Sequence, residues 1–459
     1  MASSSRDTSM CDKLREKGNA LYRQLAGPQV YAAPLRRMKC TQAEKYYQEA
    51  LAQSRTRADR ASCLKNLGML HILWTRLELV DTAIVDDEPS FVYAPHLAYA
   101  KKKAAAAVGP LVEALHSGEG KPQQWLRHLQ DHLVGFVEWA PRPLLRSLCE
   151  EFDLALGKRT VRCKAAVVAH LRFAEKQFGQ GVLNLESHNF TGCISIMNDC
   201  MQLLRKAASL EAERDSDEYI SITEMQERAE TQIFVCESMQ ACASGDQVLM
   251  RALFDEEEVN LELAFEAIDL YRSAVLLTRE RDIEGEAVAM SKLGKVYSEV
   301  IKDPERASKA HYQATKLALT VMSPRIARSD WYRYSSAKHA EHQEEVRRTE
   351  EREHEEKVAP TKKKLEEEIR SLDLEAKKEG RHFLDYIYQN HPNPDPKKTP
   401  GDMLKAENRV LTKEMLRKAI SHYHPDANVV YGEEWQVLCE EISKILNLKY
   451  EYFKLEKTS

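Results

Sequence analysis

The chain contains 459 residues, of which 43% are hydrophobic and 30% are charged, and its formal net charge is −5 at pH 7. This length exceeds the size at which a single hydrophobic core usually stops growing, so two or three structural units are expected. The small net charge argues against nucleic acid as a partner, and no apolar run approaches the roughly 20 residues that cross a membrane. Glycine and proline are scarce, which favours a helical protein over a β-sandwich, a β-barrel or a disordered chain.

The N-terminal sequence MASSSRDTSM is polar and lacks the apolar stretch of a secretion signal. It predicts an intracellular protein, cytoplasmic or alternatively nuclear. The ten cysteines are scattered without a C-x-x-C pair or another metal-binding spacing. We expect them to be reduced, and mostly buried as small hydrophobic side chains.

Residues 10–115 carry a helical pattern that repeats. Small residues such as Gly18 in "REKGNALYR" and Gly68 in "LKNLGMLH" would let two helices approach closely, and Tyr47 in "AEKYYQEAL" would fill the gap between them. The alternation of L-x-x-L-G with A-x-x-x-Y-x-x-A resembles the tetratricopeptide repeat. Residues 26–40, "AGPQVYAAPLRRMKC", are expected to be a loop insertion because their glycine and prolines would break a helix.

The same pattern returns within residues 116–335, mainly from 259 to 320. We therefore predict an all-α fold with a tetratricopeptide-like α-solenoid over residues 10–335. The alternative is a nonrepetitive helical bundle whose alanines and tyrosines are merely core, and residues 116–250 could also form a separate unit. The matching positions are Ala267, Tyr271, Ala274, Leu293, Gly294, Tyr297, Ala307, His311 and Ala314.

Two histidines in this part of the chain, His128 and His132 in "WLRHLQDHL", have the i, i+4 spacing that can hold a metal. No glutamate is placed as in H-E-x-x-H, and no third ligand is apparent. We interpret them as ordinary histidines on a helix face, and we expect no metal and no cofactor.

Residues 336–378 are almost entirely Glu, Lys, Arg and Ala. Apolar residues are too sparse for a long coiled-coil seam, whereas Glu followed by Lys or Arg after three or four residues supports a solvated helix. We predict a charged helical spacer that is interrupted at Pro360.

The last part, residues 379–459, should contain three helices. The sequences are "GRHFLDYIYQN", which runs into a proline-rich segment, then "LTKEMLRKAISHY" and "EEWQVLCEEISKILNLKYEYFK". The second helix is apolar on one face, and Lys413, Arg417, Lys418 and His422 should lie largely on other faces. The second and third helices would form an antiparallel hairpin whose connection begins with His424, Pro425 and Asp426.

The sequence "YHPDAN" after a basic amphipathic helix resembles the J-domain of the heat-shock-protein-40 family. The tetrapeptide Tyr423–Asp426 matches the family motif, Asn428 matches a frequent following residue, and Arg417 with Lys418 match a basic pair. The resemblance implies docking to the seventy-kilodalton heat-shock chaperone through His424, Pro425 and Asp426, with acceleration of its ATPase. The basic residues Lys413, Arg417 and Lys418 would supply the docking surface.

The sequence departs from the family pattern at several points. Ala427 stands where lysine is usual, Leu416 stands where tyrosine is usual, and the segment between the first two helices is unusually long. There is neither a Gly/Phe-rich segment nor a cysteine-rich zinc region. The resemblance is therefore to co-chaperones that keep only the J-domain.

Some tetratricopeptide co-chaperones hold the acidic C-terminal tail of the seventy- or ninety-kilodalton chaperone in a two-carboxylate clamp. Matching the repeat pattern places Arg15, Asn19 and Asn66 at clamp positions, with Lys101 or Lys102 as a further one. The fifth position holds Leu97 or Ala98 and lacks a basic residue. The alternative is that these are ordinary solvated helix residues.

Together these features predict a cytoplasmic co-chaperone that binds a client or partner protein through its repeats and recruits the seventy-kilodalton chaperone through a J-domain. The alternative is an interaction scaffold with a degenerate J-like domain that stimulates no ATPase. An enzyme is not expected, because no phosphate-binding loop, dinucleotide turn or nucleophile elbow is present.

Overall fold

The computed structural model describes residues 9–80, 94–157, 161–254, 259–401 and 411–456. Throughout this described part the chain forms helices joined by turns, without strands, which agrees with the predicted all-α class. The chain divides into two compact units, Met1–Ser336 and Ala337–Ser459. None of the described helices is both long and apolar enough to cross a membrane.

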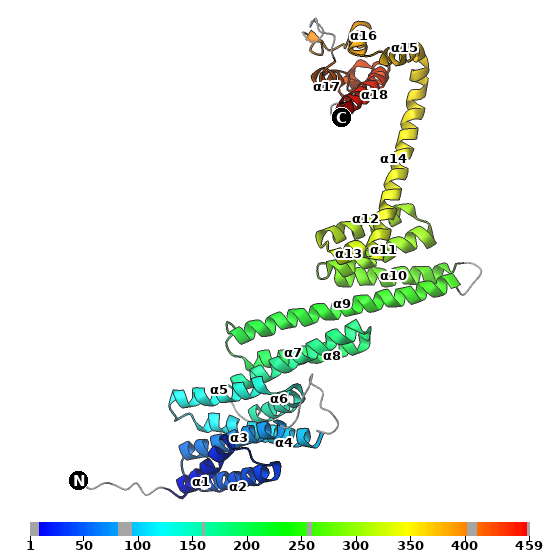
Figure 1. Ribbon diagram of the computed structural model, residues 1–459. Coiled ribbons are helices and arrows are strands. Elements are labelled where there is room, and N and C mark those ends of the chain that lie inside the picture. Colours follow the sequence, from blue (N-terminus) through cyan, green and yellow to red (C-terminus); the bar gives the residue numbers. More distant parts are fainter. Residues whose placement is uncertain (1–8, 81–93, 158–160, 255–258, 402–410, 457–459) are drawn as a thin grey trace. The chain divides into compact units, whose positions relative to one another are not determined.

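The first unit consists of helices that follow one another with short connections (Figure 1). The last of them, α14, begins in this unit and continues into the second. The helices are α1 (Met10–Ala26), α2 (Ala33–Ala52), α3 (Arg57–Leu79), α4 (Ala94–Ser117), α5 (Gln123–Trp139), α6 (Arg142–Leu156), α7 (Lys164–Glu186), α8 (Phe190–Leu210), α9 (Asp217–Phe254), α10 (Leu261–Thr278), α11 (Ile283–Val296) with the π-helical turn η2 (Tyr297–Ile301), α12 (Pro304–Thr320), α13 (Pro324–Arg328) and α14 (Asp330–Lys364).

Successive helices of the first unit pack in pairs, and in three places the first helix of one pair also touches the first helix of the next: α1 with α3, α7 with α9, and α9 with α11. The pairs with the most extensive contact are α1 with α2, α3 with α4, α7 with α8, α9 with α10, and α11 with α12. Close approach within a pair depends on small residues: a methyl group placed on Gly18 would lie 2.5 Å from the ring of Tyr47, and one on Gly245 would lie 2.7 Å from the ring of Tyr271. These glycines therefore set the spacing of their helix pairs.

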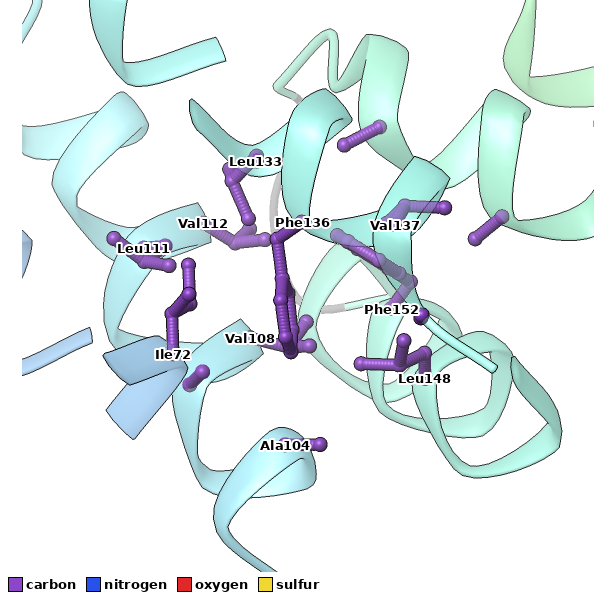
Figure 2. Close-up of a cluster of buried hydrophobic side chains, with 14 of the residues drawn as sticks. Ile72, Ala104, Val108, Leu111, Val112, Leu133, Phe136, Val137, Leu148 and Phe152 are labelled. Carbon is purple, nitrogen blue, oxygen red and sulfur yellow. The ribbon is translucent and has the colours of Figure 1, made fainter. Parts of the chain in front are cut away.

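The largest core of the first unit lies among α3, α4, α5, α6 and the beginning of α7. Figure 2 shows Phe136 of α5 at the centre of this cluster, between Val108 of α4 and Leu148 of α6. All three side chains are fully buried. Complete burial of apolar side chains of this size stabilises the fold by about 1.5–3 kcal/mol each relative to exposure.

The second unit contains the rest of α14, then α15 (Glu366–Ala376), α16 (His382–Asn390), α17 (Lys413–His422), the 3-10 turn η4 (Pro425–Tyr431) and α18 (Glu433–Glu456). Its core combines Leu372 of α15, Phe383 and Ile387 of α16, Leu416 of α17 and Ile442 of α18. The three helices expected after residue 379 are present, and α15 packs with them as a fourth.

The stretch 336–378 differs from the solvated spacer that its composition suggests. Val358 and Thr361 of α14 are buried, and Thr361 donates a hydrogen bond of 3.0 Å to Glu433 at the start of α18. An ion pair joins Lys362 to Glu441 at 3.1 Å, and Nε2 of His354 lies within hydrogen-bond distance of Glu440, at 3.3 Å; both glutamates are on α18. The end of α14 thus packs against α18, because a few apolar positions on one helix face suffice for packing even when the composition is polar.

Proline marks two further differences from the sequence analysis. Pro360 lies inside α14, which ends only at Lys364, and the interruption comes at Leu365. Residues 26–40 are only partly a loop, since α2 begins at Ala33 with Pro34 in its first turn. Proline is tolerated in a first turn because its missing N–H has no partner there in any case.

Candidate functional site

The sequence His424–Pro425–Asp426 follows the end of α17 and opens the short turn η4. Thr412 caps the start of α17 by accepting a hydrogen bond of 3.3 Å from the amide of Met415. His424 then has an extended backbone, and Pro425 begins η4. Proline has no N–H to continue α17 and its fixed φ suits the new turn, so the sequence itself separates the two elements.

Asn428 holds the turn together from the inside. Its side chain is fully buried, and its amide Nδ2 donates to the carbonyl oxygens of His422 at 3.0 Å and of His424 at 2.7 Å. Its Oδ1 in turn accepts a hydrogen bond of 2.9 Å from Asn393. These bonds fix the backbone on both sides of Tyr423, since buried polar groups that are fully bonded resist local rearrangement.

The proline-rich segment after α16 braces the same turn. Asn393 Nδ2 donates to the carbonyl oxygen of His422 at 2.7 Å, and Lys398 Nζ donates to that of Ala427 at 2.7 Å. From the sequence, this long segment was recognised only as a departure from the family pattern. The feature of the sequence that indicates a structural role for this segment is its pair of polar residues, Asn393 and Lys398.

Tyr423 anchors the turn in the core of the second unit. Its hydroxyl donates to the carbonyl oxygen of His391 at 2.8 Å, and its own carbonyl accepts from Ser443 Oγ of α18 at 2.6 Å. Burial raises the pKa of Tyr423 well above the usual value, so the phenol remains a neutral donor.

His422 is buried, and this corrects the expectation that it lies with the basic residues on an outer face of α17. Its Nδ1 is 2.8 Å from the hydroxyl of Tyr388 on α16. Burial lowers the pKa of His422, and the nearby Lys418 and Lys398 lower it further. The neutral ring can therefore accept a hydrogen bond from the Tyr388 hydroxyl in the core.

The motif side chains themselves face outward. The side chain of Asp426 is 90% exposed and that of His424 is 52% exposed, and Nδ1 of His424 lies 3.9 Å from Oδ2 of Asp426. Lys413, Arg417 and Lys418 are exposed on α17, and none of them forms an ion pair within the described part of the chain. Lys413 does lie 5.9 Å from the ring centre of Tyr450. Exposed charges that are not neutralised by ion pairs form a surface suited to a charged protein partner.

Two departures from the family pattern, Leu416 and Ala427, lie in different environments. Leu416 is fully buried in the core of the second unit, where a leucine fits without needing a hydrogen-bond partner. Ala427 is exposed next to Asp426 and removes one positive charge from the surface relative to the usual lysine. The first departure therefore concerns packing, and the second concerns the surface offered to a partner.

The structure brings together only some of the residues assigned to a carboxylate clamp. Asn66 Nδ2 of α3 donates to Asn19 Oδ1 of α1 at 2.9 Å, and Tyr47 donates to the same oxygen at 3.0 Å. Arg15 of α1 pairs with Asp12 at 2.5 Å. Lys101 and Lys102 lie on α4, the second helix of its pair, rather than on the first helix of a third pair, so the expected alignment of these lysines is wrong.

The remaining expectations concern metals and thiols. Among the described residues, no group of three His, Cys, Asp or Glu side chains is arranged to hold a metal ion. All ten cysteines are free thiols, and all except Cys242 are buried. Burial raises the pKa of Cys439 in the second unit to about 12, which keeps this thiol protonated and unreactive at neutral pH.

Comparison with models of known protein families gave no match, and a search among curated proteins gave none either.

Proposed function

We propose that this chain is a co-chaperone in which residues 379–459 of the second unit form a J-domain that recruits the seventy-kilodalton heat-shock chaperone and stimulates its ATPase. The observation that carries the proposal is the exposed His424–Pro425–Asp426 tip, held from inside by the buried Asn428. A rigid tip has little conformational entropy to lose when it docks. The chain needs no cofactor or catalytic residue for this task, since the partner carries out the hydrolysis.

The basic surface of α17 supports the same proposal. Lys413, Arg417 and Lys418 are exposed, and they would steer the domain toward an acidic surface on the chaperone. Asp426 would accept charge-assisted hydrogen bonds from a basic residue of that partner.

The first unit would bind a client or partner protein, as a tetratricopeptide-like α-solenoid in the cytoplasm or nucleus. Its paired helices and its glycines at helix contacts support this proposal. The acidic C-terminal tails of the seventy- and ninety-kilodalton chaperones are candidate ligands. Their contacts would be Asn19 and Asn66, which are bonded to each other, and Arg15, which would have to exchange its partner Asp12 for the tail.

An ATPase assay tests the proposal. The rate of single-turnover ATP hydrolysis by a cytosolic seventy-kilodalton chaperone should rise when the full chain is added. His424→Gln should abolish the increase, whereas His382→Gln, a change at an exposed histidine of α16, should retain it. Equal stimulation by both variants would exclude the motif as the cause.

A scaffold that binds the chaperone without stimulating it is the second candidate. The exposed Ala427, which takes the place of a usual lysine beside the motif, favours this candidate. Saturable binding of the chaperone together with an unchanged hydrolysis rate would establish it.

A further inference from the structure

Five basic residues form a strip on the face of the first unit where α3 and α5 meet. The basic strip is defined here as Lys65 and Arg76 of α3, Lys121 just before α5, and His128 and His132 of α5. From the sequence, the two histidines were expected to be ordinary residues of a helix face, and nothing in the sequence singled out the other three. The strip became recognisable only when the structure placed α5 beside α3.

Aromatic rings connect the members of the strip. Lys65 Nζ lies 5.6 Å and Lys121 Nζ lies 5.7 Å from the ring centre of the same Trp125. Arg76 lies 5.2 Å from the ring of Trp139, at the other end of α5. Each contact is worth about 0.5–1 kcal/mol at an exposed site, and it holds a cation in place without neutralising its charge.

The cations of the strip have no carboxylate partner within the described residues. Other basic residues nearby do have such partners. Arg60 of α3 pairs with Glu113 at 2.6 Å, and Arg37 of α2 pairs with Glu78 at 2.6 Å. The strip thus differs from these neighbouring basic residues, whose charges are balanced by carboxylates.

The like charges of the strip act on one another. Burial lowers the pKa of Lys65, and Lys121 and Arg15 lower it further. Burial also lowers the pKa of His132, and so do Lys65, His128 and Arg76, while Asp131 acts in the opposite direction. An anion bound here would relieve this repulsion, and its charge would favour protonation of His132.

The polar groups of the neighbouring α1 are already engaged within the chain. Arg15 is paired with Asp12, and Asn19 is bonded to Asn66 and Tyr47. Lys65 and Arg76 are three helical turns apart on α3, roughly 16 Å, which matches about five residues of an extended peptide. The cations without carboxylate partners therefore lie along a line, and they do not converge on one point where a single carboxylate could bind.

We propose that the basic strip binds an internal acidic segment of a partner protein, through several side-chain carboxylates and without requirement for a free C-terminus. The inference rests on the proposed function only in that the first unit binds a protein. It does not depend on the second unit, so a failure of ATPase stimulation would leave it standing. Trp125 offers an apolar surface beside the cations, against which the aliphatic parts of the bound acidic side chains can pack.

A binding assay with the full chain tests this proposal. The probe is a fluorescein-labelled peptide of six glutamates with an amidated C-terminus, followed by fluorescence anisotropy at low and high salt. We expect saturable binding that weakens as salt increases, and a loss of about tenfold or more in affinity for the double variant Lys65→Glu/Lys121→Glu. The matched control, Lys101→Glu/Lys102→Glu, changes two lysines outside the strip and should bind like the original chain.

Three outcomes would overturn the proposal. One is equal loss of affinity in the strip variant and the control variant. A second is binding only when the peptide ends in a free carboxylate, which would indicate a terminal clamp. The third is tighter binding of an oligothymidylate of equal charge through the same lysines, which would indicate a nucleic-acid surface. Circular dichroism spectra should show that both double variants retain the helical content of the original chain.

Discussion

Asn428 is the residue on which the candidate docking tip depends most directly. Its amide nitrogen donates hydrogen bonds to the carbonyl groups of both His422 and His424, and its oxygen accepts one from Asn393. Removing a buried partner leaves such groups unsatisfied, which costs about 1–3 kcal/mol for each group. The geometry of the motif therefore rests on a residue that does not itself face the partner.

Asn428→Ala should loosen the tip while His424 and Asp426 remain present. We expect faster hydrogen exchange at amides 423–431 and weaker stimulation of the chaperone ATPase, because the backbone of the turn loses two hydrogen bonds. Asn447→Ala changes an exposed asparagine of α18 and serves as the matched control. Unchanged exchange in Asn428→Ala would contradict the bracing role.

A second buried residue cluster stabilises the first unit. Glu44 of α2 lies 2.9 Å from Nε2 of His71 and 3.1 Å from Nζ of Lys103, whose ammonium also stands 3.7 Å from the ring centre of Trp74. The hydrogen bond from His71, with a further one from Lys103, lowers the pKa of Glu44 to about 2 against the opposing effect of burial. The interactions of Glu44 with His71 and Lys103 thus link α2 to α3 and α4.

The sign of the pH effect follows from this lowered pKa. Since the folded state binds the Glu44 proton less readily than the unfolded state, the contribution of Glu44 is fully present above pH about 4.5 and is lost as the pH falls toward 2. Glu44→Gln should lower the free energy of unfolding by about 1–3 kcal/mol at pH 7, and by much less near pH 2. Urea unfolding at both pH values, with Glu49→Gln of the same helix as control, measures the difference; an equal loss at both pH values would contradict the assignment.

At the scale of the elements, the sequence predicted helices better than it predicted their contacts. The three helices after residue 379 and the helix pairs that meet at Gly18 and Gly294 follow from periodicity and small residues that act locally. Which helix lies beside which depends on packing between distant segments. Lys101 and Lys102 were therefore assigned to the first helix of a third pair, whereas they lie on α4, which pairs with α3.

The packing of α14 on α18 was missed for a related reason. Its buried residues, Val358 and Thr361, are few, and they are surrounded by charged residues that indicate solvent exposure. The partner face on α18 carries Glu433, Glu440 and Glu441, whose charges are complementary to those of α14. Composition alone shows neither the position of the apolar residues nor their partner.

Val358→Asp should separate the end of α14 from α18. The buried carboxylate would cost several kcal/mol, so we expect faster hydrogen exchange in residues 433–441. Val346→Asp introduces the same charge at a valine of α14 that is 41% exposed, and it should have little effect. Equal exchange in the two variants would show that this contact does not stabilise α18.

At the scale of the whole molecule, the two candidate binding surfaces belong to different units. The basic strip lies in the first unit, and the His424–Pro425–Asp426 tip lies in the second. Separate surfaces would allow one chain to hold a partner and to recruit a chaperone at the same time. Their effects should then be separable by mutation.

The double variant Lys65→Glu/Lys121→Glu should lose acidic-peptide binding but retain ATPase stimulation. Asp426→Asn should retain peptide binding and lose stimulation. Peptide anisotropy and ATP hydrolysis measured on the same preparations test both halves of this expectation. Loss of both activities in either variant would contradict independent surfaces.

The central claim is that the tip at Asp426 activates a partner ATPase, and single-turnover ATP hydrolysis by the seventy-kilodalton chaperone tests it most directly. The rate is compared for the full chain, Asp426→Asn, and Asp373→Asn, a change at an exposed aspartate of α15. We expect stimulation by the full chain and by Asp373→Asn, and none by Asp426→Asn, although all three remain folded. If stimulation survives in Asp426→Asn, or if the folded full chain does not stimulate, the proposed role of this tip is wrong.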